Sequence, residues 1–371
     1  MQEALAGLSE IVQALAKDGI KDKAGWREWR KGHGTLIETA LGYERAGKMP
    51  AASSLVSAFF HPTLPLIGLN YTPVAHNTLH ASPAGWTPAL RLCRGIVFDR
   101  DGRLVAKPFE KFFNYNEHEE TKRLPDEPFT ATVKHDGHLG IIFEHGNEWH
   151  ITTRGDFASR TSKVAAAMLK RYAQRGSWDD KLPCGTNLLV EIIHPQTKVH
   201  LRYRGERFVL IGAFERDTLR DLGQTELVKL GKALGLPVTE RWAGDSIREL
   251  VALTQDLTVR NREGYVVRFQ SGLRVKFKFA SYINLMVEAK LSYAYLLNRI
   301  LADNLEKMIG NLDEEIQDKA RAMVADILNA RKVPGTEKER RQYLYELVPP
   351  EESTQYYRGL CRKVLKKIDA A

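Results

Sequence analysis

Apolar residues recur at helical spacing near both ends of the chain. The run "EALAGLSEIVQALAKDG" ends at Gly19, and the pattern continues through residues 35–47 and 51–60. Residues 1–58 are therefore expected to be mostly helical. From about residue 284 onward the spacing is helical again, with little β pattern, which predicts a separate all-helical C-terminal part.

The middle of the chain reads as strands. Three stretches combine two β-rich runs with a turn between them, at "DRDG", "HGN" and "QSG", and each predicts a hairpin. Further strands are predicted in "LPLIGLNYT", "NLLVEII" and "RFVLIGAFE", and helices in "SRTSKVAAAMLKRYA", "GQTELVKLGKALG" and "DSIRELVALTQDL". The expected fold class is α+β with antiparallel sheets over residues 1–283, followed by a helical domain over residues 284–371.

Composition narrows the class of protein. The 371 residues suggest two domains, and 43% hydrophobic with 27% charged residues is typical of a globular protein. The net charge of +9 favours an anionic partner, with nucleic acid ahead of a membrane surface; a basic enzyme without such a partner is the alternative.

The three cysteines are widely spaced in the sequence, which argues against a disulfide framework and against a structural zinc site. No apolar run approaches the roughly 18 residues of a membrane span, and the N-terminal helix carries internal charges. We expect a cytoplasmic protein without a membrane partner.

The sequence "KHDG" at residues 134–137 joins a Lys, an Asp and a Gly at the start of an apolar run. Its simplest interpretation is a turn. A lysine amine can also attack the α-phosphate of a nucleotide, provided that burial or neighbouring cations make the free amine accessible. That reading requires cations and a metal ligand elsewhere in the chain.

The third hairpin can supply them. In "RVKFKF", strand alternation places Arg274, Lys276 and Lys278 on one face and apolar residues on the other. Like charges in a row are unfavourable without an anion, although a solvated strand face would show the same pattern. Glu263 precedes Gly264 on the partner strand and is expected to hold a hydrated divalent cation, with the glycine leaving room for a phosphate.

Together these motifs resemble the covalent nucleotidyltransferases, and most closely the RNA ligase 1 family of bacteriophage T4. The resemblance rests on six stretches in the family's order: "CRGIVFDRDGRLVAKPFEKFFNYNE", "KHDG", "TTRGDF", "LLVEIIHP", "REGYVV" and "RVKFKFASY". It covers residues 90–283 and implies an adenylyltransferase fold. His135 departs from the acidic residue that often follows the family's lysine, and Arg154 stands where the family has another basic residue.

The resemblance implies a role for each matching residue. Lys134 would be the adenylated nucleophile, with Lys276 and Lys278 as the catalytic cations at the α-phosphate. The residues implied in ATP binding are Arg94, Lys111, Arg154, Glu191, Glu263 and Tyr282, and the metal, Mg²⁺ or Mn²⁺, would be held by Glu263 and Asp136. Phe112 and Phe113 are expected in the core, and Gly137 is expected to leave room for the nucleotide.

The implied reaction is ATP-dependent RNA ligation. A lysyl-adenylate and then an RNA-adenylate would join a 5′-phosphate to a 3′-hydroxyl, in repair of RNA such as tRNA, by a monomeric enzyme. The alternatives are a DNA ligase or capping guanylyltransferase, which usually carry an OB-fold barrel instead of helices, and an inactive RNA-binding adaptor. The basic helix "YYRGLCRKVLKKI" would grip RNA or be a solvated helix face.

Overall fold

The computed structural model describes residues 1–79, 85–176, 178, 181–182, 185–310, 312, 314–348 and 352–370. The chain divides into two compact units, Met1–Phe279 and Ala280–Ala371. The domain boundary expected after residue 283 falls inside the first helix of the second unit, α11 (Ala280–Lys290).

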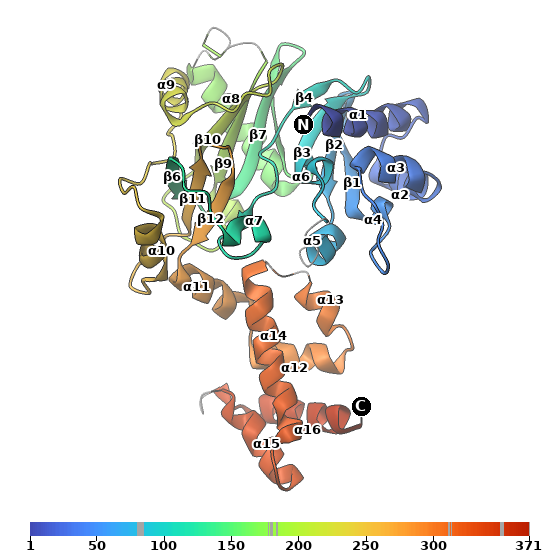
Figure 1. Cartoon of the computed structure of the whole chain (residues 1–371), viewed down its shortest axis with the longest axis vertical. Helices are drawn as coiled ribbons and strands as arrows, with labels where there is room; N and C mark the ends of the chain where they lie inside the picture. The colour runs from blue at the N-terminus through green and yellow to red at the C-terminus, as the bar shows by residue number, and fades with distance from the viewer. Residues whose placement is uncertain are drawn as a thin grey trace. The chain divides into compact units, whose positions relative to one another are not determined.

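The N-terminal helices cover one face of a four-stranded antiparallel sheet (Figure 1). In α1 the residues Leu8, Ile11, Val12 and Leu15 lie one helical turn apart and are all buried, which is the pattern of a one-sided helix. The helices are α1 (Gln2–Lys17), α2 (Lys23–Gly32), α3 (Gly34–Leu41), α4 (Ala52–Leu55), α5 (Pro73–Leu79) and α6 (Pro88–Leu92). The strands are β1 (Val56–Phe60), β2 (Leu66–Tyr71), β3 (Arg94–Asp99) and β4 (Leu104–Ala106), in that order.

The prediction of a helix over residues 51–60 is wrong for the second half of that stretch. Only α4 is helical, and Val56–Phe60 forms β1, which pairs with β2 in antiparallel register. The segment "VSAFF" is β-branched and aromatic, and its edge of the sheet buries Val56, Ala58 and Phe59. Sheet pairing therefore overrides the helical spacing that continues from the preceding residues.

A second sheet, in the order β10-β9-β7-β8, is fully antiparallel. Its even-numbered residues on β9, such as Leu188 and Val190, share a buried cluster with Met168 and Leu169 of α8, so α8 covers that face. Leu189 packs on the other face with residues of the first sheet. The bounds are β7 (His138–His145), β8 (Glu148–Thr153), β9 (Thr186–Ile193), β10 (Arg207–Glu215), α8 (Arg160–Gly176) and α9 (Gln224–Leu234).

The third sheet has the order β5-β12-β11-β6 and is antiparallel except for the pair β5 and β12. Its strands are β5 (Phe113–Asn114), β6 (Phe129–Lys134), β11 (Gly264–Phe269) and β12 (Arg274–Lys278), with α7 (Glu119–Lys122) and α10 (Ile247–Gln255) nearby in the same unit. All three predicted hairpins are confirmed: β3 with β4, β7 with β8, and β11 with β12.

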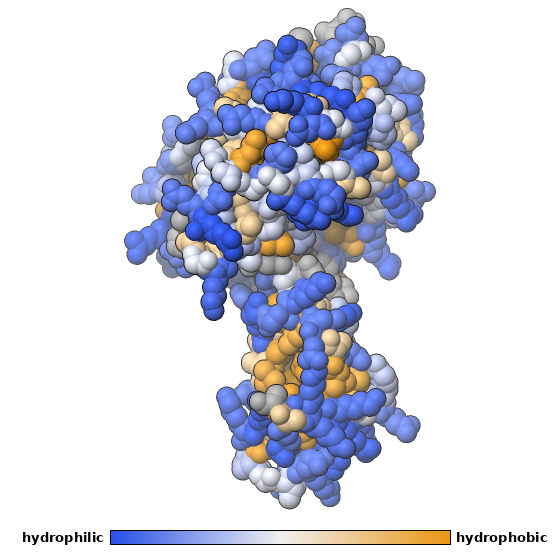
Figure 2. All heavy atoms as spheres, turned by 90° about the vertical axis from the view of Figure 1, so that its right-hand side faces the viewer, coloured by the Kyte–Doolittle hydropathy of each residue, from blue (hydrophilic) through white to orange (hydrophobic). Residues whose placement is uncertain are grey.

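The second unit is helical, so the expected α+β class with a helical C-terminal region is confirmed. Its helices are α11, α12 (Tyr293–Leu301), α13 (Leu305–Ile309), α14 (Glu314–Asn329), α15 (Glu337–Glu346) and α16 (Gln355–Ala370). In α16 the apolar residues Leu360, Val364 and Ile368 are buried, whereas Arg362 and Lys366 are exposed. Figure 2 shows hydrophobic residues gathered on one face of this unit.

Cys93 and Cys361 are buried and free, and Cys184 lies outside the described residues. Among the helices that the structure describes, none has the length and apolar character needed to cross a bilayer.

Candidate active site

Sheet register aligns the predicted catalytic lysines on one face of the third sheet. Gly264 of β11 pairs with Lys134 of β6 on one side and with Lys278 of β12 on the other. Two residues further along β11, Val266 lies between Thr132 and Lys276 in the same way. Because side chains alternate along a strand, both rows point to the same face.

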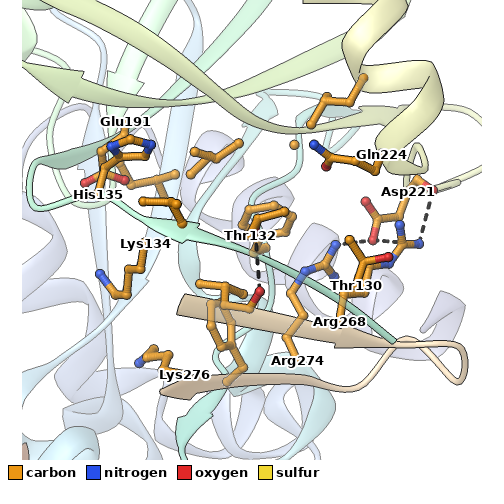
Figure 3. Close-up of a pocket in the computed structure, with 18 of the residues that line it drawn as sticks. Thr130, Thr132, Lys134, His135, Glu191, Asp221, Gln224, Arg268, Arg274 and Lys276 are labelled. Atoms are coloured by element: carbon orange, nitrogen blue, oxygen red, sulfur yellow. Dashed lines mark hydrogen bonds and ion pairs between the residues drawn. The ribbon is translucent and has the colours of Figure 1, made fainter. Parts of the chain in front are cut away.

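That face forms one wall of a pocket of about 230 Å³. Lys134, Lys276 and Lys278 all line it, while Val275, Phe277 and Phe279 on the opposite face are buried. The predicted two-faced strand is therefore confirmed. A third row, Thr130, Arg268 and Arg274, continues the wall, and Asp221 pairs with both arginines (Figure 3).

Glu263 does not line the pocket itself, but it contacts two of the lysines on this wall. Its Oε1 lies 2.7 Å from Lys134 Nζ and 3.7 Å from Lys278 Nζ, and its side chain is 5% exposed. Oε2 is buried and has no hydrogen-bond partner in the described part of the chain. A buried carboxylate oxygen without a partner is costly, so this atom is well suited to accept a ligand.

Glu191 lies on the opposite wall, on β9 of the second sheet. Its Oε1 accepts a hydrogen bond of 3.0 Å from the Gly137 amide, which joins the turn at residues 134–137 to this wall. Burial raises the pKa of Glu191 to about 7, and Glu263 adds to the rise while Lys134 opposes it. The carboxyl therefore changes its charge close to neutral pH.

Two glycines have tasks that differ from the expected ones. A side chain on Gly264 would meet the Phe277 carbonyl oxygen at 2.0 Å, and one on Gly137 would meet the Ile192 carbonyl oxygen at 2.5 Å. Both positions were expected to leave room for a nucleotide or a phosphate. The structure instead fills the space with neighbouring strand backbone, so these glycines permit close strand packing around Lys134.

Phe112 packs against a buried cluster as expected and also lines the pocket, and Phe113 is fully buried as expected. The Lys276 ammonium lies 5.0 Å from the centre of the Phe112 ring, and the Arg94 guanidinium lies 5.7 Å from it. The ring thus holds two predicted phosphate-binding cations by cation–π contact.

Sequence reasoning missed Tyr71 of β2. Its hydroxyl accepts a hydrogen bond of 3.0 Å from Arg154 Nη1, and it also bonds to Arg94. The Arg154 guanidinium lies 5.0 Å from the Tyr71 ring. Arg94 and Arg154, which are far apart in sequence, therefore meet at one tyrosine. The "NYTP" stretch gave no signal beyond an ordinary strand end.

Lys111 is placed differently from the other predicted cations. It is 4% exposed, and its Nζ lies 4.8 Å from the ring centres of both Trp86 and Phe113. It lines an adjoining cavity of about 400 Å³, which shares Phe112, Asp221, Arg268 and Arg274 with the first pocket. Its predicted contact with the phosphates would be made from that side.

Asp136 faces away from the pocket toward the loop after β9. One carboxylate oxygen accepts a hydrogen bond of 2.8 Å from the His200 amide and another from the Leu201 amide. It lines a separate cavity beside that loop. The observed contacts give Asp136 the task of anchoring the loop, and its role as a metal ligand stays a prediction.

His135 contributes more than its sequence position indicates. It lines the pocket close to Glu191 (Figure 3), and its buried Nε2 has no hydrogen-bond partner among the described residues. Burial lowers the pKa of His135 to about 4, with Arg207 and Lys134 adding to the effect, so the ring is neutral at neutral pH. Tyr282 is buried on α11 of the second unit.

The metal prediction can be tested on the donor atoms. No group of three or more potential metal ligands is present among the described residues. Glu263 Oε2 does fit a hydrated divalent cation, since Mg²⁺ commonly takes one or two carboxylates together with water and substrate phosphates.

Antiparallel sheets that enclose a lysine, two carboxylates and a row of cations define a nucleotidyltransferase type of site. A sequence model of the family described as RNA ligase, of the T4 RNA ligase 1 type, matches residues 92–282. The chain belongs to this family, and the resemblance noted in its motifs is confirmed.

Relatives agree with this assignment. The chain is 29% identical over 199 residues to the "Putative RNA ligase" of Thermovibrio ammonificans, which covers 49% of the chain and 48% of the relative. It is 25% identical over 177 residues to RNA ligase 1 of bacteriophage TS2126, covering 42% and 40%. The chain thus spans about half the length of the curated relatives it matches.

Among solved structures, an RNA ligase of Naegleria gruberi with ATP and manganese is similar at a TM-score of 0.34 and 19% identity, over 42% of this chain and 50% of that one. The same ligase with pyrophosphate gives a TM-score of 0.34 over 43% and 51%. A likeness of this size says nothing further about the site.

Proposed function

We propose that the protein is an ATP-dependent RNA ligase that works through a lysyl-adenylate on Lys134. The observation that carries the proposal is the row of Lys134, Gly264 and Lys278 across one sheet face, with Glu263 beside it and Glu191 on the facing wall. A lysine nucleophile and cations for an α-phosphate line one pocket, and the carboxylate proposed for a metal contacts two of these lysines.

In the first step the free amine of Lys134 attacks the α-phosphorus of ATP. A nitrogen–phosphorus bond forms, the bond from the α-phosphorus to the bridging oxygen breaks, and pyrophosphate leaves. Lys276 and Lys278 neutralise the charge that develops on the α-phosphate oxygens. Lys134 is paired with Glu263 in the structure, so this ion pair must open before the attack.

The remaining predicted residues bind the nucleotide. Glu191 accepts a hydrogen bond from a ribose hydroxyl, and Arg94 and Arg154, held together at Tyr71, contact phosphate oxygens from one side. Lys111 contacts them from the adjoining cavity. Tyr282, the remaining predicted nucleotide ligand, belongs to the second unit, and its role stays a prediction. Glu263, with Asp136 as the second predicted ligand, would hold Mg²⁺ or Mn²⁺, which supplies charge neutralisation at the phosphates.

Two transfers complete the reaction. A 5′-phosphate oxygen of RNA attacks the lysyl-adenylate phosphorus, the nitrogen–phosphorus bond breaks, and the amine of Lys134 is restored. A 3′-hydroxyl of RNA then attacks the phosphorus of the activated 5′-phosphate, AMP leaves, and a phosphodiester forms. In both steps the pocket contributes positioning and charge neutralisation.

The proposed partner is RNA with a 5′-phosphate and a 3′-hydroxyl, and the proposed setting is cytoplasmic repair of RNA, including tRNA, by a monomer. The net charge of +9 and the exposed cations Arg358, Arg362, Lys363 and Lys366 of α16 support an RNA partner.

A sealing assay tests the function. Nicked stem-loop and single-stranded RNAs with a labelled 5′-phosphate are incubated with ATP and Mg²⁺ or Mn²⁺. Joined RNA and a transient RNA-adenylate are expected, and a 3′-phosphate in place of the hydroxyl should make the adenylate accumulate. Joining of DNA alone, or transfer of GMP alone, would replace the proposal with a DNA ligase or a capping enzyme. An absence of covalent transfer would leave a binding protein.

A further inference from the structure

The loop that joins β9 to β10, residues 194–206, is rich in basic residues. We name it the basic loop. It contains Lys198, Arg202 and Arg204 together with two histidines, and Glu206 is its one acidic residue. A short 3₁₀ turn, Pro195–Thr197, opens it.

Three cations of the basic loop are not paired with any carboxylate that the structure describes. Lys198, Arg202 and Arg204 are exposed, and none makes an ion pair with any residue in the described part of the chain. The single acid of the loop, Glu206, already pairs with Arg171 and with His194, the latter at 3.0 Å. Like charges gathered in this way create a potential that favours an anionic partner.

Hydrogen bonds join the basic loop to the nucleophile turn, which comprises residues 134–137 and contains Lys134. Asp136, two residues after Lys134, accepts hydrogen bonds from the His200 and Leu201 amides and donates its own amide to the Tyr203 hydroxyl at 2.9 Å. His138 Nε2 lies 2.9 Å from the Thr197 carbonyl oxygen. An anion held by the loop is therefore held at a fixed place beside the reactive lysine.

A cavity of about 240 Å³ lies between the loop and the nucleophile turn. Its lining includes Thr197, Lys198 and Arg202, and it shares no lining residue with the nucleotide pocket. The Thr197 hydroxyl is buried and has no hydrogen-bond partner among the described residues. A phosphate oxygen would accept that hydrogen bond, because a buried hydroxyl without a partner is unfavourable.

We propose that Lys198, Arg202 and Arg204 bind the phosphodiester backbone of RNA next to the end that reacts at Lys134. The inference rests on the proposed function, which makes RNA the polyanion that must reach this turn. Phosphate contacts of this kind position a nucleic acid without reading its sequence. Arg94, Lys276 and Lys278, the cations proposed at the ATP phosphates, line the nucleotide pocket and not this cavity, so this site serves the second substrate.

The test compares two triple variants with the same loss of charge. K198Q/R202Q/R204Q neutralises the basic loop. K163Q/K170Q/R175Q neutralises exposed residues of α8, which covers the face of the second sheet opposite Glu191. Lysyl-adenylate formation without RNA, affinity for a 5′-phosphorylated single-stranded RNA from 50 to 200 mM salt, and sealing are measured for each.

The loop variant is expected to form the lysyl-adenylate at the wild-type rate and to bind RNA less tightly. Removing three phosphate contacts should reduce the slope of log affinity against log salt by about 2, because each contact contributes about 0.7 on a single strand. The ratio of the wild-type RNA affinity to that of the loop variant should therefore fall about 20-fold between 50 and 200 mM salt. The α8 variant should behave as the wild type does.

Wild-type RNA affinity and salt slope in the loop variant would overturn the proposal while leaving the ligase function intact. Equal weakening in the α8 variant would overturn it too, since only overall charge would then matter. Loss of lysyl-adenylate formation in the loop variant would place its effect in the nucleotide pocket, again against the proposal. Failure of the wild type to form any lysyl-adenylate would instead refute the proposed function.

Discussion

Lys134 Nζ lies 2.7 Å from Glu263 Oε1, although 129 positions separate the two residues in the chain. The pairing follows from sheet register, because β11 begins at Gly264, opposite the last residue of β6. Its consequence is that the proposed nucleophile and the proposed metal ligand hold each other until substrate arrives. A nucleotide with its metal would take over the carboxylate and release the amine.

Glu263→Gln should separate the pairing of residue 263 with Lys134 from its proposed binding of a metal. The amide keeps a hydrogen-bond acceptor near Lys134 but loses the negative charge that a divalent cation requires. We expect lysyl-adenylate formation to fall about 100-fold, and the metal concentration for half-maximal formation to rise about tenfold or more. Asp217→Asn, which removes an exposed carboxylate of the same unit, is the control. An unchanged metal dependence in Glu263→Gln would contradict the assignment.

The raised pKa of Glu191 predicts that the free energy of unfolding depends on pH. Its pKa is about 7 in the folded protein and near 4.3 when unfolded, so the folded state holds the extra proton between these values. Stability should therefore fall as pH rises from about 4.5 to about 7, by up to about 3 kcal/mol, and stay level above that.

Glu191→Gln should abolish this fall, and Glu148→Gln on the exposed end of β8 should follow the wild type. Urea unfolding at several pH values measures the difference. The same pH slope in Glu191→Gln and in the wild type would show that another group is responsible.

Gly264→Ala should destabilise the first unit. The added methyl group would lie 2.0 Å from the Phe277 carbonyl oxygen and 2.8 Å from Lys278 Cα, and strand backbone cannot move aside cheaply. We expect a loss of about 3 kcal/mol, seen as a lower urea midpoint. Gly32→Ala at the end of α2, where the methyl group meets nothing within 4 Å, should stay close to the wild type. Equal midpoints for the two variants would refute this packing role.

Tyr71→Phe should weaken ATP use without harming the fold. The change removes the hydroxyl that accepts from Arg154 and bonds to Arg94, so both guanidinium groups lose a fixed position. We expect the efficiency of lysyl-adenylate formation to fall about tenfold, mainly through a higher KM for ATP. Tyr43→Phe, which removes a hydroxyl that donates to Pro50, should have no such effect. A wild-type KM in Tyr71→Phe would show that the arginines are positioned without it.

Local patterns predicted much of the fold. The alternation in "RVKFKF" identified the lysine face and the buried face of β12, and turn residues located three hairpins. The error at residues 51–60 arose because helical spacing and strand alternation are hard to distinguish over a short apolar run. There the pairing of β1 with β2 decides the structure, and pairing is not a local property.

The contacts between the site residues were harder to predict than the motifs that contain them. Each candidate could be named from its own stretch, yet the meeting of Arg94 and Arg154 at Tyr71 depends on how the first two sheets pack. Gly137 and Gly264 were given the wrong neighbours, because only tertiary structure shows that strand backbone fills the space beside them. The sequence likewise gave no sign that Asp136 anchors the basic loop.

The proposed reaction depends on a covalent bond between Lys134 and AMP. The most direct measurement is peptide mapping by mass spectrometry after incubation with ATP and a divalent metal. One AMP on Lys134 is expected in the wild type, and none in Lys134→Arg, which keeps the charge near Glu263. AMP on another residue, or equal modification of Lys134→Arg, would contradict the account.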